Sequence, residues 1–393
     1  MVSLIAKVAA LVLPAIFMFL FNKWKKSKSM NLPPGPRKLP IIGNLHQISN
    51  PPFRCFRDLS NQYGPLMHLK LGESTFVIVS SPDLAKQMLK DLDPCFADRP
   101  QGVVTDILFY HSSDIVFSPY GDYWRQMRKL CINELLSPKM VRLFQFIRSD
   151  ETVRLINSLQ ESSGSSVNLT EKIFSHSSSI TCRAAFGGVI KDNEALMKLM
   201  VDSTEMAGGF EIADLFSSSR LVGALSWTKR RLKTMRRKLD VILDDIIDRH
   251  KRNRVENIES GGGWRLRNSE FGSEDLVDVF LRVQEEGQLQ FPIDNDNIKA
   301  VLYDMFIAGT ETSSSTIDWT MVELLRHPHV MAKAQAKMTF GLAIVESALA
   351  QLLYNFDWKL PVGVRAGDLD MIENNGITAL RKHNLFVVAT PYN

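Results

Sequence analysis

Apolar residues recur every three to four positions over most of the chain, a spacing typical of amphipathic helices. A polar connection at residues 72–74 separates two short apolar runs, Leu66–Leu71 and Thr75–Ser80, and the second run is rich in β-branched residues. This pair predicts an antiparallel hairpin. We therefore expect a mainly α protein with a small β component. The helical spacing covers residues 122–160, 192–207, 226–252, 273–286, 294–326 and 338–356.

The first apolar stretch lies near the N-terminus, where Val8–Phe21 contains no charged residue. Extended back to Val2, it reaches about the 20 residues that a helix needs to cross a bilayer. Four lysines follow within residues 23–28, and no acidic residue occurs before Asp58. Such a charge distribution keeps the rest of the chain in the cytoplasm, whereas a cleaved signal peptide would carry its charges before the apolar run. The sequence predicts a single-pass membrane anchor at residues 1–22.

A basic and proline-rich hinge is predicted at residues 23–40. Three prolines within Leu32–Pro36 fix φ and remove backbone donors, so a helix from the membrane does not continue through this segment. The remaining residues, 41–393, are expected to form one domain. The chain is 45% hydrophobic and 23% charged, which is an ordinary globular composition.

Charge and cysteine spacing exclude two classes of protein. Residues 229–238 contain seven Lys or Arg, but aspartates follow within residues 240–248 and an apolar stripe runs through both segments. We interpret this region as an amphipathic surface helix and expect no nucleic-acid binding. The glycine-rich residues 255–274 are predicted to be a loop. The four cysteines lack the spacing of zinc ligands or of a disulfide-rich scaffold, and no metal site is predicted. They are Cys55, Cys95, Cys131 and Cys182.

One segment breaks the helical pattern within residues 294–326. Ala308–Ser315 contains a glycine and five hydroxyl residues, which are poor choices for a helix interior. A threonine hydroxyl that bonds to a carbonyl one turn earlier can open a groove in a helix. Glu311 beside Thr312 adds a titratable carboxyl group. Two interpretations stay open from the residues alone, a groove that admits a ligand or a polar kink that faces solvent.

At this point the sequence resembles a known family. The segments Leu32–Pro36, Tyr123–Lys129 and Ala308–Thr312, in this order, are similar to those of a plant microsomal cytochrome P-450, a haem-thiolate monooxygenase. Ser118–Trp124 and Phe356–Pro361 resemble enzymes of plant secondary metabolism that hydroxylate terpenoids or alkaloids. The resemblance implies the cytochrome P-450 fold with an N-terminal transmembrane helix.

The resemblance also implies a haem site and assigns residues to it. Trp124 and Arg128, four positions apart on one helix face, would hold a haem propionate. Ala308 and Gly309 would leave room for dioxygen over the iron.

In the same helix Thr312 would donate a hydrogen bond where oxygen is activated, and Glu311 would relay protons from water. The substrate would contact three segments, Val103–Phe117, Ala300–Asp304 and Gly376–Ala379. These segments are apolar or small, which suits a lipophilic molecule.

The family activity would be insertion of one oxygen atom from O2 into a small lipophilic plant metabolite, with electrons derived from NADPH. The expected partner is NADPH-cytochrome P-450 reductase, and the expected location is the endoplasmic reticulum membrane with the body in the cytoplasm.

The resemblance is interrupted between Lys337 and Met338. Relatives carry there the loop whose cysteine ligates iron, and this chain has no cysteine after Cys182. Thiolate ligation is therefore impossible at the usual position, and we predict an internal deletion at 337/338. The Glu-x-x-Arg pattern that ends at Arg326 is interpreted as an ordinary helical ion pair. Among the four cysteines, Cys131, seven residues after Trp124, is the best candidate for a substitute iron ligand.

The sequence thus predicts a member of the monooxygenase family that is inactive in this form because the ligating cysteine is missing. The alternative is a non-catalytic, membrane-anchored protein that binds a lipophilic ligand or another protein.

Overall fold

The structure is a computed structural model in which the chain divides into two compact units, residues 1–87 and 88–393. The predicted anchor at residues 1–22 and the first part of the hinge lie outside the described residues. In the part that is described, no helix is both long and apolar enough to span a bilayer. The predicted domain boundaries stay predictions. The described residues are 32–188, 190–219, 227–259, 274–287, 289–337 and 344–392.

The N-terminal unit is built on the predicted hairpin. Strands β1 (Leu66–Leu71) and β2 (Ser74–Val79) pair antiparallel, with Leu66 opposite Val79, and the hairpin prediction is confirmed. Alternate β1 side chains, including Leu69, are buried and form the unit's core. The unit's helices are α2 (Pro52–Tyr63) and α3 (Pro82–Lys86).

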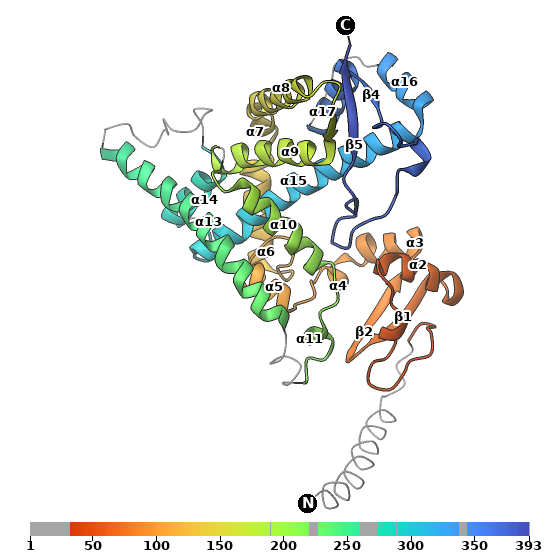
Figure 1. The fold of residues 1–393 in the computed structure, drawn as a ribbon. Coiled ribbons are helices and arrows are strands. Elements are labelled where there is room, and N and C mark those ends of the chain that lie inside the picture. Colours follow the sequence, from red (N-terminus) through yellow and green to blue (C-terminus); the bar gives the residue numbers. More distant parts are fainter. Residues whose placement is uncertain are drawn as a thin grey trace, which may run out of the picture. The chain divides into compact units, whose positions relative to one another are not determined.

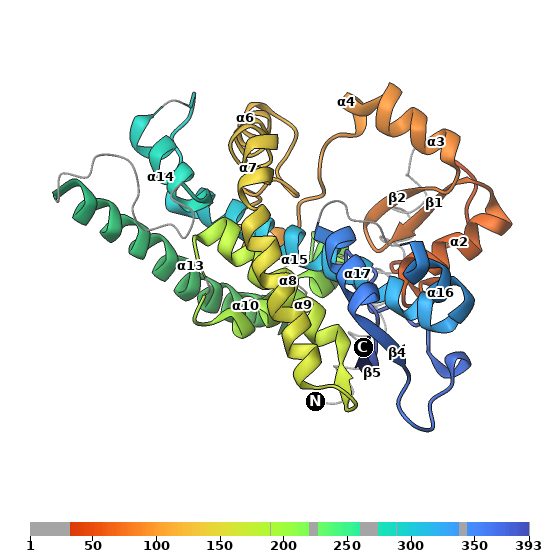
Figure 2. The same ribbon diagram turned by 90° about the horizontal axis from the view of Figure 1, so that it is seen from above.

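The C-terminal unit is organised around one long helix, α15 (Asn295–Arg326), which packs along α9 (Leu169–Phe186) (Figure 1). From above, α8 (Gln145–Glu161) lies along the other side of α9 (Figure 2). The first half of α15 lies in one hydrophobic core and its second half in another. The long helix therefore connects both cores.

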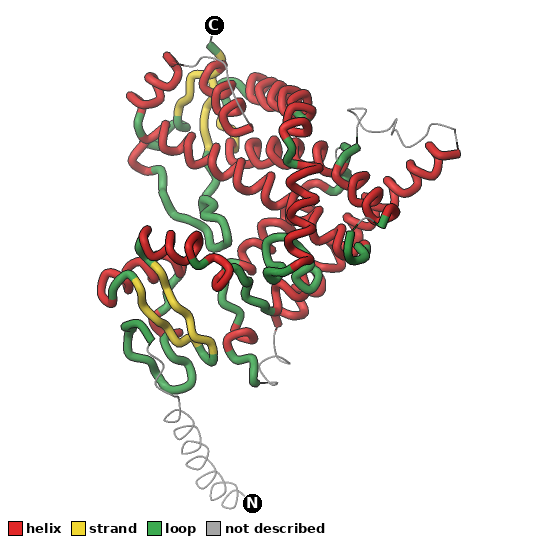
Figure 3. The backbone as a smooth tube through the Cα atoms, turned by 180° about the vertical axis from the view of Figure 1, so that it is seen from behind, coloured by secondary structure: helices red, strands yellow, loops and turns green. Residues whose placement is uncertain are grey.

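The two cores use different elements. The first contains α10 (Asn193–Ala207), α13 (Trp227–Glu259) and α14 (Leu276–Glu286). The second contains α17 (Ile344–Asn355) and a sheet with the strand order β3-β5-β4. Figure 3 shows how small the strand content is beside the helices. The sheet strands are β3 (Ser166–Asn168), β4 (Phe356–Lys359) and β5 (Phe386–Pro391). The other helices are α4 (Asp93–Phe96), α5 (Val103–Leu108), α6 (Asp122–Leu130), the π-helical turn η3 (Cys131–Leu135), α7 (Pro138–Leu143), α11 (Ile212–Leu215) and α16 (Pro328–Lys337).

Most predicted helices are confirmed, including α10, α13, α14 and α15. The helical pattern of residues 122–160 is instead divided into α6, η3, α7 and α8. Pro138 begins α7 after Ser137, whose hydroxyl oxygen accepts a hydrogen bond from the Met140 N–H. The apolar stripe predicted for α13 is buried throughout.

Two predictions were wrong or incomplete. Residues 255–259, predicted as loop, continue α13, while 260–273 lie outside the described residues. Helix α9 was not predicted, because it is buried on several sides and so lacks a polar face with a clear period. The signal for its start is Asn168, whose side chain accepts a hydrogen bond from the Glu171 N–H at 3.2 Å.

Candidate functional site

Helix α15 carries an exposed stripe on an otherwise buried surface. Ala308, Thr312 and Thr316 recur at intervals of four and are exposed, while most of the helix is buried. The Thr312 hydroxyl donates to the Ala308 carbonyl oxygen at 2.6 Å, and the Thr316 hydroxyl donates to that of Thr312 at 2.8 Å. The helix is continuous through this segment, because the hydroxyl groups bond within it. The break in the sequence pattern thus forms an open polar stripe and not a helix end.

Gly309 has a packing role that the sequence did not indicate. A Cβ atom at this position would lie 2.9 Å from the Thr181 hydroxyl oxygen on α9. The absence of a side chain therefore lets α9 and α15 approach closely. Gly309 is directed to α9, whereas Ala308 lies on the exposed stripe.

Glu311 is directed away from the exposed stripe, into the protein. Its side chain is buried beside the hydroxyl groups of Thr204 on α10 and Thr378. Burial raises the pKa of Glu311 to about 7, although hydrogen bonds from these two hydroxyls act in the opposite direction. The structure therefore does not bring Glu311 and Thr312 to the same face. It places a carboxyl group that can hold a proton at neutral pH against a predicted substrate segment, Gly376–Ala379.

Trp124 and Arg128 lie together on α6, as predicted. The guanidinium carbon of Arg128 is 5.1 Å from the centre of the Trp124 ring. The Trp124 indole N–H donates to the Ile115 carbonyl oxygen at 3.0 Å, so this donor is already used. Arg128 is exposed and makes no ion pair with any residue that the structure describes. Of the two, Arg128 is the group free to bind an anion.

The predicted substrate segments are joined by Asp304, a residue that sequence reasoning did not single out by itself. Its carboxylate accepts hydrogen bonds from the main-chain N–H groups of Ile115 at 2.7 Å and Val116 at 3.2 Å. Ile115 thus links α6, through Trp124, to α15. The Ile377 N–H donates to the Thr204 carbonyl oxygen, which brings the third segment to α10.

Asp114 completes a buried carboxyl pair with Asp304. Both residues are almost fully buried, and Asp114 accepts a hydrogen bond from the Phe117 N–H at 3.0 Å. Burial and the neighbouring Asp114 charge raise the pKa of Asp304 well above its usual value, and burial raises the pKa of Asp114 to about 6. One proton shared by the pair avoids two adjacent buried charges. The signal in the sequence is an aspartate within the apolar run 300–307.

Burial favours the neutral thiol form of both buried cysteines of this unit. Burial raises the pKa of Cys131, at the start of η3, to about 12. Burial likewise raises the pKa of Cys182, on α9, to about 12. Thiolate is the form that ligates iron, and both thiols are held protonated. Cys95 is exposed, and Cys55 is buried in the N-terminal unit.

The paired residues elsewhere on α15 have structural explanations. Arg326 lies 3.5 Å from Glu323, which is the exposed ion pair of ordinary helical type that we predicted. His327 follows as the residue that caps α15, and Pro328 begins α16. The His327-Pro328 sequence is therefore a helix terminus.

The fold and the α15 stripe identify the class of protein. The profile of the cytochrome P-450 family matches residues 33–340, and the chain belongs to this family. A solved zebrafish cytochrome P-450, determined with progesterone, has the same fold, with a TM-score of 0.57 and 25% identity. The match covers 73% of this chain and 63% of that one.

The similar curated proteins are plant oxygenases. Premnaspirodiene oxygenase of Hyoscyamus muticus is 39% identical over 491 alignment positions, with 96% of each chain covered. The 5-epiaristolochene 1,3-dihydroxylase of Nicotiana tabacum is 39% identical over 493 positions, with the same coverage. This chain has only 393 residues, so each relative has residues at many positions where this chain has none. An internal deletion agrees with these lengths, and its position at 337/338 stays a prediction.

Haem is the cofactor of the family. The residues present supply some of the contacts that haem binding requires, but not the iron ligand. The exposed stripe of α15 would lie against the haem. Arg128, which makes no ion pair in the described part of the chain, would hold a propionate. In this family a cysteine thiolate would hold the haem iron, and the described cysteines of the C-terminal unit offer two buried thiols and one exposed thiol. The described cysteines therefore do not fit thiolate-ligated haem.

Proposed function

We propose that the chain derives from a monooxygenase that inserts one oxygen atom from O2 into a small terpenoid, and that in this 393-residue form it has no such activity. The observation that carries the proposal is the absence of any cysteine after Cys182. A thiolate on haem iron supplies the electron density that favours O–O cleavage. The protonated, buried Cys131 and Cys182 support the view that no other cysteine replaces it.

Support for the terpenoid class comes from the relatives and from the lining of the site. One relative is named for premnaspirodiene and another for 5-epiaristolochene. Val116 and Ile377, in two of the predicted substrate segments, are exposed apolar side chains. Such side chains favour contact with a lipophilic molecule.

The cellular setting is part of the same proposal. The apolar run Val8–Phe21 and the lysines after it support a single-pass anchor in the endoplasmic reticulum membrane, with the body in the cytoplasm. Electrons would come from NADPH through cytochrome P-450 reductase.

The experiment compares two proteins in membranes that contain the reductase. One is the chain itself, and the other, called the restored chain, carries between Lys337 and Met338 the segment that premnaspirodiene oxygenase has and this chain lacks. We expect NADPH-dependent oxygenation of 5-epiaristolochene or premnaspirodiene by the restored chain only. The matched control is the restored chain with the inserted cysteine ligand changed to serine, which should be inactive. Turnover by the unmodified chain would refute the proposal.

A further inference from the structure

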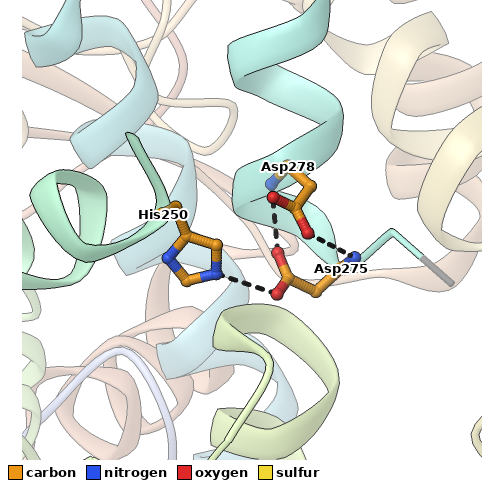
Figure 4. A group of neighbouring side chains, drawn as sticks. All are labelled: His250, Asp275 and Asp278. Carbon is orange, nitrogen blue, oxygen red and sulfur yellow. Dashed lines mark hydrogen bonds and ion pairs between the residues drawn. The ribbon is translucent and has the colours of Figure 1, made fainter. Parts of the chain in front are cut away.

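Three side chains far from the α15 stripe converge where α13 meets the start of α14 (Figure 4). His250 comes from α13, Asp275 is the N-cap residue of α14, and Asp278 lies in its first turn. One ligand atom from each residue lies within 4.8 Å of the others. The His250 Nε2 and Asp275 Oδ2 atoms are 2.9 Å apart.

Main-chain hydrogen bonds orient all three groups and leave one ligand atom on each. The Asp278 N–H donates to Asp275 Oδ1 at 3.0 Å, and the Asp275 N–H donates to Asp278 Oδ2 at 3.4 Å. His250 Nδ1 lies 2.7 Å from the Ile246 carbonyl oxygen, and its Nε2 faces Asp275 Oδ2 in a hydrogen bond that is an ion pair when the imidazole is protonated. A metal ion would take the place of the proton between His250 Nε2 and Asp275 Oδ2, and Asp278 Oδ1 would be its third ligand atom.

The available oxygen of Asp278 is buried without a partner. Asp275 and Asp278 are each only 2% exposed, and Oδ1 of Asp278 accepts no hydrogen bond from the described part of the chain. Two buried carboxyl groups side by side are unfavourable unless a cation or proton compensates them.

The neighbouring residues leave the cluster available to a cation. Arg254 donates to the main-chain oxygen of Asp278 and pairs with Glu285 at 2.9 Å, so these contacts do not occupy the carboxylate oxygens. A Cβ atom at residue 187 would lie 2.2 Å from Asp275 Oδ2, so only a glycine fits against this oxygen. Gly187 ends α9 with a φ of 71°, so the end of α9 and the start of α14 meet here beside α13.

We infer that His250, Asp275 and Asp278 form a binding site for one divalent transition-metal ion of the zinc type. One imidazole nitrogen and two carboxylate oxygens are ligands that Zn²⁺ accepts, and water can complete a tetrahedral set. An imidazole whose other nitrogen is bonded to a main-chain carbonyl is a common arrangement for a metal ligand. The ion would link α13 to α14 and stabilise the folded chain, independently of haem and of monooxygenase activity.

Zn²⁺ binding to the purified, chelator-treated full chain tests the inference by titration calorimetry. We expect one equivalent to bind and to raise the unfolding temperature. Asp278→Asn should weaken binding at least tenfold, because the amide keeps the helix cap but loses the charge. His250→Gln, a second variant that can still bond to Asp275, should have the same effect.

Two controls separate this site from general charge effects. Asp248→Asn makes the same charge change on an exposed position of α13, and His329→Gln removes an exposed imidazole. Both variants should bind Zn²⁺ within twofold of the unaltered chain. The inference is wrong if the chain binds no equivalent of Zn²⁺, or if both site variants bind as the unaltered chain does. In that case the cluster is a helix cap held by a shared proton.

Discussion

The Thr312 hydroxyl donates a 2.6 Å hydrogen bond to the carbonyl oxygen of Ala308, one turn earlier on α15. This bond satisfies the hydroxyl proton while the oxygen stays on the exposed stripe, where it can accept a hydrogen bond. A residue that is unfavourable for a helix interior is thereby accommodated without ending the helix. The contact explains how the sequence break at residues 308–315 coexists with 32 residues of continuous helix.

Replacement of this hydroxyl should uncouple the restored chain. In Thr312→Ala we expect NADPH consumption to continue while product per NADPH falls about tenfold or more and peroxide is released, because a group that positions a proton is lost. The matched control is Thr316→Ala, which removes an equivalent hydroxyl one turn later on the same stripe. Product and NADPH are measured together. If Thr312→Ala keeps the product formed per NADPH of the restored chain, the Thr312 hydroxyl does not position a proton.

Glu311 should make the stability of the unmodified chain depend on pH. Its pKa is raised by burial from 4.5 to about 7, so the folded state binds a proton more tightly than the unfolded state. The free energy of unfolding should therefore fall as the pH rises from about 4.5 to 7. Glu311→Gln should remove this part of the slope and gain on the order of 1 to 3 kcal/mol at pH 7.5.

Urea unfolding at pH 5 and pH 7.5 measures this difference. The control is Glu323→Gln, an exposed carboxyl group on the same helix that pairs with Arg326 at 3.5 Å. This control should leave the pH dependence that Glu311 causes in place. A variant at Glu311 that keeps the full pH slope would show that the carboxyl group is ionised in the folded protein throughout this range.

Arg128 should contribute to haem binding in the restored chain. A guanidinium bonded to a propionate contributes about 1.5 to 3 kcal/mol, so Arg128→Ala should lower haem affinity about tenfold or more. Arg125→Ala is the control, because Arg125 lies on the same helix but pairs with Asp122. Haem retained per polypeptide after gel filtration is the measurement. Equal haem retention by both variants would show that Arg128 does not bind haem.

The N-terminal anchor can be tested by truncation. Deletion of residues 1–22 should move much of the protein from the microsomal fraction to a soluble or aggregated fraction, because the apolar run is lost. Fractionation with an antibody against the body provides the measurement. Secretion of the full chain with a new N-terminus near residue 22 would instead indicate a cleaved signal peptide.

The fold was largely predictable where one helix face is polar. The stripe of α13 and the limits of α10 followed from spacing, since these helices have a buried and a solvated side. Helix α9 could not be found in this way, because several of its polar residues are buried. Its buried serines and Arg183 lie against neighbouring elements and do not mark a solvated face. Periodicity carries no information where burial surrounds the helix.

The roles of the candidate site residues stay predictions, and the directions of their side chains could not be predicted from the sequence. Spacing placed Trp124 and Arg128 on one face, and the structure confirms this. It could not show that the Trp124 N–H is bonded to Ile115, or that Glu311 is directed away from Thr312. The carboxyl pair of Asp114 and Asp304 also escaped prediction, because it joins residues 190 positions apart through main-chain groups.

The central claim is that the chain is a cytochrome P-450 without its thiolate ligand, and the ferrous-carbonyl spectrum tests it most directly. The purified 393-residue chain, reduced in the presence of haem and carbon monoxide, should lack the red-shifted Soret band of a thiolate complex. The restored chain should show the band. A thiolate band in the unmodified chain would contradict the account, and its loss in Cys131→Ser would identify the replacement ligand.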